Sequence, residues 1–496
     1  MDDNNKENGV IGIEAASVTD NNTLTNNSTQ ENIELGADIP PGREQERKEI
    51  INRISGLEFN INHIIGAGIF IIPSTIWRLV QSPGTALMFW LAGGLISLLG
   101  STIYVELGSR CPKGSGEQKY LEEAFNDQNK PADSYACAKY FLYAVKGNYE
   151  NEDIYLDSIP LRLLAIAILF VITLYHMLSN RWAIIINRMF AIFKSIAILF
   201  VSIYGFANAK NQLTFNNTPS DEAYEPSIIE HIGSHGNSIV LILFTYEDLT
   251  EELKSPNVNL KFSGFLSVIV SSILYLMINT AFILVVSPHD AINSYDVIAI
   301  NFGRTLWGDS GRIFMSMLIS FSAFGCVSSM VFMGSRAITY AAKYGFIPKI
   351  SDKLFYWNQT FNTPFYALLL QFCYCAALIL FIAVGQSFFV FFAEMSLYSA
   401  ILFYGVGAVC LLKLKKYHKG AQYQHFKVWK IFVWIYLLCT AFIAVAPFFP
   451  IRSSKYEPLN YKSFVPFFAS WIPILISVSI WYLHDYKKVF NTRECF

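Results

Sequence analysis

Charged residues are scarce in this sequence of 496 residues. They make up 15% of the chain, against about 25% in a typical soluble protein. The 37 Lys and Arg residues nearly balance the 38 Asp and Glu residues, so no overall basic character points to nucleic acid. Hydrophobic residues reach 53% and the mean hydropathy is +0.36. Compact soluble domains cannot hide that much apolar surface, so we expect a polytopic membrane protein.

Cysteine motifs and a secretory leader are also missing. The eight cysteines show neither CxxC pairs nor zinc-ligand spacing, which excludes a disulfide scaffold and a zinc module. Residues 1–50 are polar and rich in Asn and Glu, and they lack the short apolar core of a cleaved signal peptide. We expect a disordered cytoplasmic tail over 1–50, a membrane domain over 51–485 and a short cytoplasmic tail over 486–496.

Long apolar runs with few or no charges recur along the rest of the chain. A membrane-spanning helix needs about 20 apolar residues, because the hydrocarbon core is roughly 30 Å thick. This length predicts ten helices: 59–77, 85–105, 163–180, 183–205, 262–289, 313–335, one that begins at Thr363, one that passes Glu394 and ends at Leu412, 431–451 and 463–484. Two further segments, 134–145 and 236–249, give only about 18–21 Å of helix each. Counting both gives twelve helices in an all-α protein.

The distribution of Lys and Arg tests whether the two short segments cross the membrane. With twelve spans and a cytoplasmic N-terminus, a clear majority of these residues falls in cytoplasmic segments, as the positive-inside rule requires. The excess disappears if only one short segment fails to span, and it returns if both fail. Both segments therefore span or neither does. The twelve-span arrangement places 206–235 outside, where Asn216 begins the glycosylation sequon Asn216-Asn217-Thr218.

The first span carries Gly66-Ala67-Gly68 in its middle. Each Gly disfavours a helix interior by about 1 kcal/mol, and Pro73 follows, so the helix can break at mid-membrane. A broken helix exposes backbone N–H groups and a positive helix end that suit a carboxylate, a common arrangement in secondary transporters. The alternative is that the Gly-x-Gly spacing forms a close-packing surface between helices. The spacing alone leaves both interpretations open.

Several motifs occur in an order typical of one transporter family. They are GAGIFIIPSTI (66–76), Ser82-Pro83-Gly84, Trp90, Gly94, Tyr104-Val-Glu-Leu-Gly108, PKGSGEQKYLEEAF (112–125), NRMFAIFKSIAIL (187–199), EELKSP (251–256) and FSAFGCVSSMVFMGSRAITYAAKYGFIPK (321–349). From about residue 50 onward the chain resembles the amino-acid/polyamine/organocation (APC) permeases. It is most similar to the L-type amino-acid transporter branch, which includes fungal methionine-type permeases.

The resemblance implies a twelve-helix transporter fold built from a 5+5 inverted repeat, with helices one and six broken. It also implies a substrate site. Backbone N–H groups of Gly66, Ala67 and Gly68 would hold the substrate carboxylate. Carbonyl groups of Ile65 and of the segment Phe244, Thr245 and Tyr246 would receive its amino group.

Lys194 stands in an otherwise apolar span. It could snorkel toward the membrane surface, although it lies well inside the span. The resemblance implies a different role, because family members have a lysine here whose ammonium occupies the place of a sodium ion in sodium-coupled relatives. This implies sodium-independent transport.

Other ionisable groups inside predicted spans have two interpretations each. Glu394 interrupts a long apolar run, where it can form a structural hydrogen bond or serve in proton coupling. His63 precedes the glycine motif and is either a core histidine or a proton relay. Glu106, in the YxELG motif, is expected to anchor the loop after the second helix.

Both short helices coincide with departures from the family pattern. Tyr246 is followed directly by Glu247-Asp248-Leu249-Thr250-Glu251, where the family has about six more residues. The third helix lacks its first half. Helices three and six therefore look truncated, through exon losses in a gene model or as a natural variant. We hypothesise that the chain as written transports poorly, and the alternative to a transporter is a transport-deficient amino-acid sensor.

The expected function is secondary transport of neutral L-amino acids, such as methionine or other large ones, by alternating access. We expect no enzyme activity, because only His63 and His176 lie in spans and neither has a paired nucleophile or acid motif. No cofactor or metal is expected. The loop 146–159 contains no Cys, so no disulfide-linked heavy chain is expected. We expect the plasma membrane, with a vacuolar or endosomal membrane as the alternative.

Overall fold

The computed structural model describes residues 53–110, 159–213, 228–246, 256–293, 297–343, 350–358, 360–381 and 426–449, with isolated positions between 398 and 415. All of them belong to one unit, Glu46–Phe496. Its helices are α1 (Arg53–Ile64), α2 (Gly68–Val80), α3 (Pro83–Arg110), α7 (Ile159–Leu178), α8 (Asn180–Ala207), α9 (Ile228–Phe244), α10 (Pro256–Val285), α11 (Pro288–Asn293), α12 (Ile298–Lys343), α13 (Ser351–Phe355), α14 (Phe365–Phe381), α16 (Lys430–Val445) and the 3₁₀ turn η2 (Ala446–Phe448).

The described part of the chain is helical, and its only β pairing is an isolated bridge between Asn358 and Thr363. Within it, five helices are long and apolar enough to cross a membrane, and the bent pair α1–α2 makes a sixth span. This confirms a polytopic all-α membrane protein. The predicted helices 134–145 and 463–484, and most of the one ending at Leu412, lie outside the described residues. The twelve-helix 5+5 arrangement therefore stays a prediction.

Two predicted boundaries were wrong. The segment predicted at 236–249 is a helix of 17 residues that begins at Ile228, inside the predicted external loop 206–235. Polar residues of its first turns hid this start from an apolar-run criterion. The segment predicted at 313–335 belongs to the longer α12, which contains a break at Gly308, where φ is +61° and ψ is −141°. A glycine tolerates this left-handed backbone without steric penalty.

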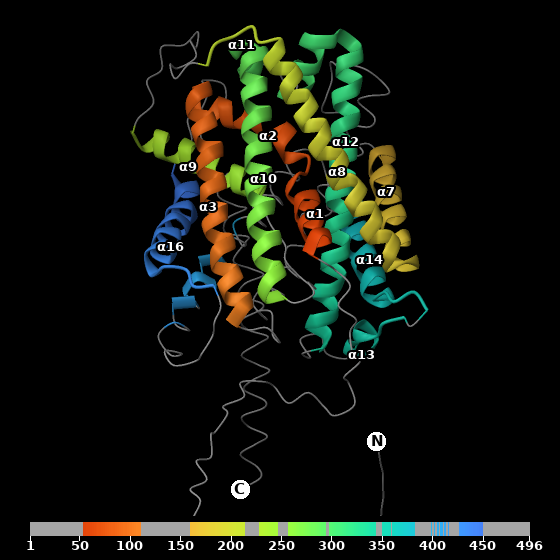
Figure 1. Cartoon of the computed structure of the whole chain (residues 1–496). Coiled ribbons are helices and arrows are strands. Elements are labelled where there is room, and N and C mark those ends of the chain that lie inside the picture. The colour runs from red at the N-terminus through yellow and green to blue at the C-terminus, as the bar shows by residue number, and fades with distance from the viewer. Residues whose placement is uncertain are drawn as a thin grey trace, which may run out of the picture. The chain divides into compact units, whose positions relative to one another are not determined.

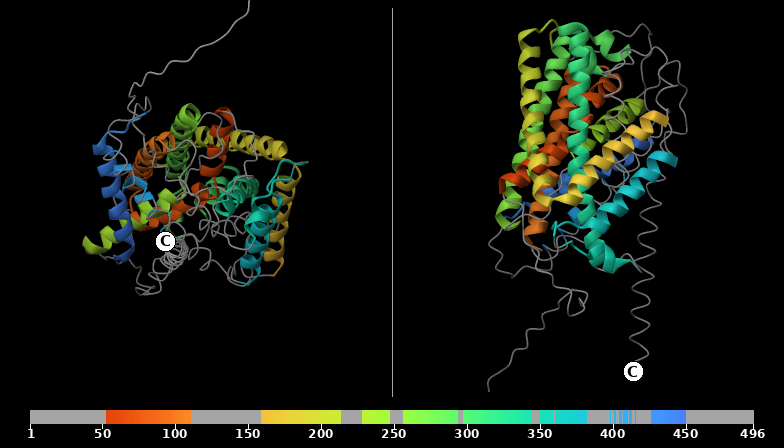
Figure 2. Two further views of the ribbon diagram at one scale, coloured as in Figure 1. Left: turned by 90° about the horizontal axis from the view of Figure 1, so that it is seen from below. Right: turned by 90° about the vertical axis from the view of Figure 1, so that its right-hand side faces the viewer.

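Helix α10 occupies the centre of the arrangement, where it packs against α3, α1 and α8 (Figure 1). Helices α7 and α14 form a neighbouring pair that also contacts α12. Helix α16 packs against α3 and α9 on the side away from α7, as the view from below shows (Figure 2). Of the two halves of the first span, α1 packs against α10, α8 and α12, whereas α2 packs against α9, α3, α11 and α12.

The side chains of α8 are distributed as in a helix that packs in lipid. Its buried positions recur at helical spacing and are mostly small or polar: Ala183, Asn187, Ala191, Lys194, Ile198, Val201, Ser202 and Gly205. Its exposed face carries large apolar side chains: Trp182, Met189, Ile192, Phe193, Ile196, Phe200 and Ile203. Small residues and interhelical polar contacts inside, with an apolar surface outside, are characteristic of helices packed in lipid.

Glu106 fastens the end of α3 to the chain that precedes α16. Its carboxylate is fully buried, accepts a hydrogen bond from the Val428 backbone N–H at 2.8 Å and lies 2.8 Å from the Lys415 ammonium. Lys415 also donates to the Val428 carbonyl. We expected Glu106 to anchor the loop after α3. That loop lies outside the described residues, so the prediction stays untested. The described partners of Glu106 lie more than 300 positions away in sequence, where no local motif could indicate them.

Removing the cation of this pair should destabilise the protein. In Lys415→Met the Glu106 carboxylate stays buried without the ammonium, and breaking a buried pair costs about 3–5 kcal/mol. We expect a lower thermal unfolding temperature in detergent, partly restored by adding Glu106→Gln. Lys427→Met, an exposed neighbour, is the matched control. Equal unfolding temperatures for the two lysine variants would contradict the prediction.

Candidate functional site

The first span is broken at the glycine motif. Helix α1 ends at Ile64, α2 begins at Gly68, and the two are bent by 44°. A Cβ added at Gly66 would lie 3.2 Å from the Cys326 sulfur, and one at Gly68 would lie 2.9 Å from the Thr245 methyl carbon. Both interpretations of the motif therefore hold together. The glycines permit the break, and they also let α9 and α12 approach the broken segment closely.

Lys194 donates to carbonyl groups at the end of α1. Its side chain is 1% exposed, and its Nζ lies 2.9 Å from the Asn62 carbonyl oxygen and 2.7 Å from that of Ile65. The ammonium thus lies inside the protein and does not snorkel to a membrane surface. The C-terminal end of a helix carries partial negative charge, which a cation stabilises. Lys194 thereby fixes the carbonyl side of the break.

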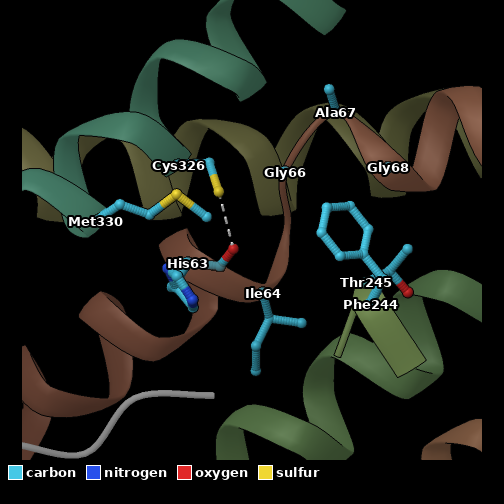
Figure 3. A pocket seen from close by; sticks show the side chains of 9 residues that line it. All are labelled: His63, Ile64, Gly66, Ala67, Gly68, Phe244, Thr245, Cys326 and Met330. Carbon is cyan, nitrogen blue, oxygen red and sulfur yellow. Dashed lines mark hydrogen bonds between the residues drawn. The ribbon is translucent and has the colours of Figure 1, made fainter. Parts of the chain in front are cut away.

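Two side chains of α12 occupy further carbonyl groups of the break. The Ser322 hydroxyl lies 3.2 Å from the Ile65 oxygen and 2.9 Å from the Gly66 oxygen. The Cys326 thiol donates to the His63 carbonyl at 3.2 Å (Figure 3). We predicted that the Ile65 carbonyl would receive a substrate amino group. In this conformation Lys194 and Ser322 both already point to that oxygen, and its predicted role stays untested.

Tyr275 of α10 links the break of the first span to the turn that follows α9. Its hydroxyl oxygen lies 2.6 Å from the Ile64 carbonyl oxygen and 2.9 Å from that of Thr245. A tyrosine hydroxyl has only one proton, so these two carbonyls share a single donor. The side chain is fully buried. The sequence analysis missed it, although a tyrosine in an apolar span normally needs a polar partner.

The backbone N–H groups at the break have fewer partners than its carbonyl groups. The Gly66 N–H donates to the Ile64 carbonyl at 2.9 Å. Among the described residues, the N–H groups of Ala67, Gly68 and Ile69 have no backbone acceptor, and no side chain caps the start of α2. These groups form the positive end of α2, which favours an anion. Two of the three predicted N–H donors thus remain available, and Ile69 is an additional one.

A pocket lies at this helix end (Figure 3). Its lining comes from α1, the break, α9 and α12: His63, Ile64, Gly66, Ala67, Gly68, Phe244, Thr245, Cys326 and Met330. Phe244 and Thr245 come from the end of α9, where the chain closes in a turn with the Thr245 N–H bonded to the Ile242 carbonyl. Tyr246 is not part of the lining; its ring instead packs near Trp90 and Tyr275.

The first half of the first span, α1, is held by a buried polar network. The Asn62 amide donates to the Asn187 side-chain oxygen and to the Gly325 carbonyl, both at 2.7 Å. The Ser328 hydroxyl donates to the same Asn187 oxygen at 3.0 Å. Helix α1 is thereby joined to α8 and α12 by side chains that are all buried.

The remaining predicted site residues are less informative. His63 is buried, with 6% of its surface exposed, and lines the pocket. Nothing in this geometry tests it as a proton relay. Glu394 and Asn216 lie outside the described residues. Within the described part of the chain, no group of three His, Cys, Asp or Glu side chains could hold a metal ion.

Removing the Tyr275 hydroxyl should loosen both the break of the first span and the turn after α9. Tyr275→Phe leaves the Ile64 and Thr245 carbonyls without this donor in a buried site, and an unsatisfied buried group costs about 1–3 kcal/mol. We expect a lower thermal unfolding temperature than for Tyr398→Phe, the matched control, which removes a buried hydroxyl bonded to the Ala444 carbonyl away from the break. A smaller effect at Tyr275 than at Tyr398 would argue against the bridge.

Comparison with known proteins shows which family the chain matches. The chain matches the amino acid permease family over residues 54–476. It is 27% identical over 380 residues to the high-affinity methionine permease of Saccharomyces cerevisiae, a match that covers 73% of this chain and 65% of that protein.

Two animal relatives are equally similar. Asc-type amino acid transporter 1 of Mus musculus is 27% identical over 418 residues, covering 81% of this chain and 77% of the relative. Large neutral amino acids transporter small subunit 2 of Homo sapiens is 27% identical over 419 residues, covering 80% and 75%. These relatives are transporters and not enzymes. The chain belongs to the amino acid permease family, within the APC superfamily.

Proposed function

We propose that this chain transports neutral L-amino acids across a membrane by alternating access and without sodium. The observation that carries the proposal is the start of α2, where the N–H groups of Ala67, Gly68 and Ile69 lack backbone acceptors beside a pocket. The relatives, a methionine permease and a large neutral amino acids transporter, point to the same substrate class.

The substrate carboxylate would bind these N–H groups, which combine free donors with the positive end of α2. The amino group would bind carbonyl oxygens at the end of α9, around Phe244 and Thr245, because Lys194 and Ser322 already donate to the Ile65 oxygen. The residues that line the pocket include no Asp, Glu, Lys or Arg. This lining, with Ile64, Phe244 and Met330, favours an uncharged and apolar substrate side chain.

Sodium independence is inferred from Lys194. Its ammonium already supplies a positive charge to the carbonyls of Asn62 and Ile65. A sodium ion at the same oxygens would have to displace a buried, covalently attached cation. The protein therefore carries its own cation, and transport needs none from the medium at this position.

Alternating access would use the two interrupted helices as hinges. In the APC arrangement, α1–α2, α3, α9 and α10 form the moving bundle, and α8 and α12 belong to the part against which it rocks. Tyr275 joins the two breaks within the bundle, whereas Lys194, Ser322 and the Asn62 network join the first break to the other part. When the two parts move relative to each other, the hydrogen bonds of Lys194, Ser322 and Asn62 across their boundary must break and be replaced.

We place the protein in the plasma membrane with both termini in the cytoplasm and without a disulfide-linked heavy chain. The acidic loop 146–159 fits the external side in this orientation, and its lack of cysteine supports the absence of such a disulfide. We favour transport over a sensor that only binds because the relatives are transporters. The shortening after Tyr246 led us to hypothesise poor transport, but the pocket residues Phe244 and Thr245 precede it, so we now expect transport.

Uptake by a host that lacks its own amino-acid permeases tests the function. We expect the chain to raise uptake of labelled methionine or another neutral amino acid well above the empty-vector host. Replacing sodium by choline should change the rate less than about twofold, because Lys194 supplies the cation. Lys194→Met should reduce uptake at least tenfold, whereas Arg181→Met, at an exposed position of α8, should have little effect.

Two outcomes would contradict the proposal. Uptake that depends steeply on sodium would refute the role given to Lys194. Saturable binding to the purified protein without uptake in cells would instead identify the sensor. In the same assay, a panel of acidic, basic and neutral amino acids identifies the substrate class. Comparing the uptake rates at two pH values tests proton coupling.

Glycosylation tests the orientation. If both short segments span, Asn216 lies outside, and we expect a glycan that endoglycosidase removes and that Asn216→Gln abolishes. A cysteine introduced by Asn217→Cys leaves the Asn216 sequon intact. Its labelling by an impermeant thiol reagent, compared with that of the unchanged chain, gives a second readout. Protection of that cysteine in intact cells, with no glycan on Asn216, would show that this segment is cytoplasmic.

A further inference from the structure

Two histidines stand one turn apart near the start of α9, outside the proposed substrate site. His231 and His235 are separated by four positions, and their ring centroids lie 5.6 Å apart with an interplanar angle of 33°. Residues four apart in a helix share one face. The pocket uses only the opposite end of this helix, Phe244 and Thr245, so the proposed function leaves this pair unexplained.

The geometry of His235 fixes which nitrogen can bind a ligand. Its Nδ1 lies 2.5 Å from the His231 carbonyl oxygen. A carbonyl oxygen only accepts, so Nδ1 carries the proton, and the lone pair of the neutral ring is on Nε2. Such a hydrogen bond from the other ring nitrogen is the usual second contact of a metal-binding histidine.

The His235 ring is also held in place by packing. It meets the ring of Phe89 from α3 edge to face, with centroids 5.2 Å apart and an angle of 85°. His231, in contrast, is exposed. It can turn about its own side-chain bonds without disturbing the helix. One imidazole is therefore oriented in advance, and the other is free to complete a chelate with it.

We propose that His231 and His235 form a bidentate site for a borderline transition-metal ion such as Zn²⁺ or Cu²⁺. Two histidines at this spacing on one helix face are a known zinc-ligand arrangement. Imidazole suits zinc and copper, whereas Mg²⁺ and Ca²⁺ prefer oxygen ligands. With Zn–N bonds of about 2.0–2.1 Å, one ion fits between the two rings, and water completes its coordination.

The site should be weaker than a structural zinc site. The described part of the chain supplies no third His, Cys, Asp or Glu ligand, and structural sites use four protein ligands. In the proposed orientation the start of α9 is on the external side, so the ion would come from the medium. The proposal itself concerns binding and does not depend on the transport activity.

Copper binding to the purified full-length chain tests the site. The protein is prepared in detergent with an affinity tag that contains no histidine. We expect one tight Cu²⁺ ion whose electron paramagnetic resonance spectrum shows coupling to two nitrogen nuclei, and competition by Zn²⁺ but not by Mg²⁺. His231→Gln or His235→Gln should weaken binding at least tenfold.

A matched variant keeps the number of histidines and changes only their spacing. In His235→Gln combined with Ile239→His, the two imidazoles stand eight positions apart, about 12 Å along the helix axis, which is too far for one ion. We expect this variant to bind as weakly as His231→Gln. Unchanged binding in the variants, or a wild-type spectrum with one nitrogen ligand, would overturn the proposal. Gel filtration and thermal unfolding of each variant establish that it is folded.

Discussion

The backbone groups freed where α1 meets α2 constrain the rest of the structure. In a membrane interior, water is not available to satisfy them, so the protein must do so itself. On the carbonyl side it does, with Lys194 from α8, Tyr275 from α10, and Ser322 and Cys326 from α12. Each of these helices must therefore stand within hydrogen-bond distance of one short segment. The break thus determines which helices gather around it.

The two sides of the break are satisfied unequally, and this difference gives the site its chemistry. The carbonyl oxygens have donors from fixed side chains, including the Lys194 ammonium. The N–H groups of Ala67, Gly68 and Ile69 have no backbone acceptor among the described residues. A group that binds here must supply acceptors and negative charge, as a carboxylate does. On the carbonyl end, the Lys194 ammonium already occupies the oxygens of Asn62 and Ile65.

Sequence patterns predicted features that depend on one segment and missed those that depend on two. Apolar runs located most described helices, and Gly66 and Gly68 located the break. Lys194 was conspicuous because a charge in an apolar span is rare. Tyr275 was not, since its role follows from the approach of Ile64 and Thr245, which lie far apart in sequence. The partners of Glu106 were missed for the same reason. The start of α9 was missed because Glu230 and two histidines interrupt its apolar pattern.

The shortened sequence after Tyr246 can be judged against this geometry. The residues of α9 that face the pocket, Phe244 and Thr245, precede the shortening. Thr245 also reaches the hydroxyl of Tyr275, so the α9 end is tied to the first break without any residue beyond 246. Gly68 permits the close approach of Thr245 from the other side. The described contacts of α9 with the site thus all precede the departure from the family pattern. The shortening therefore bears on how α9 connects to α10, and it gives no reason of its own to expect a missing binding site.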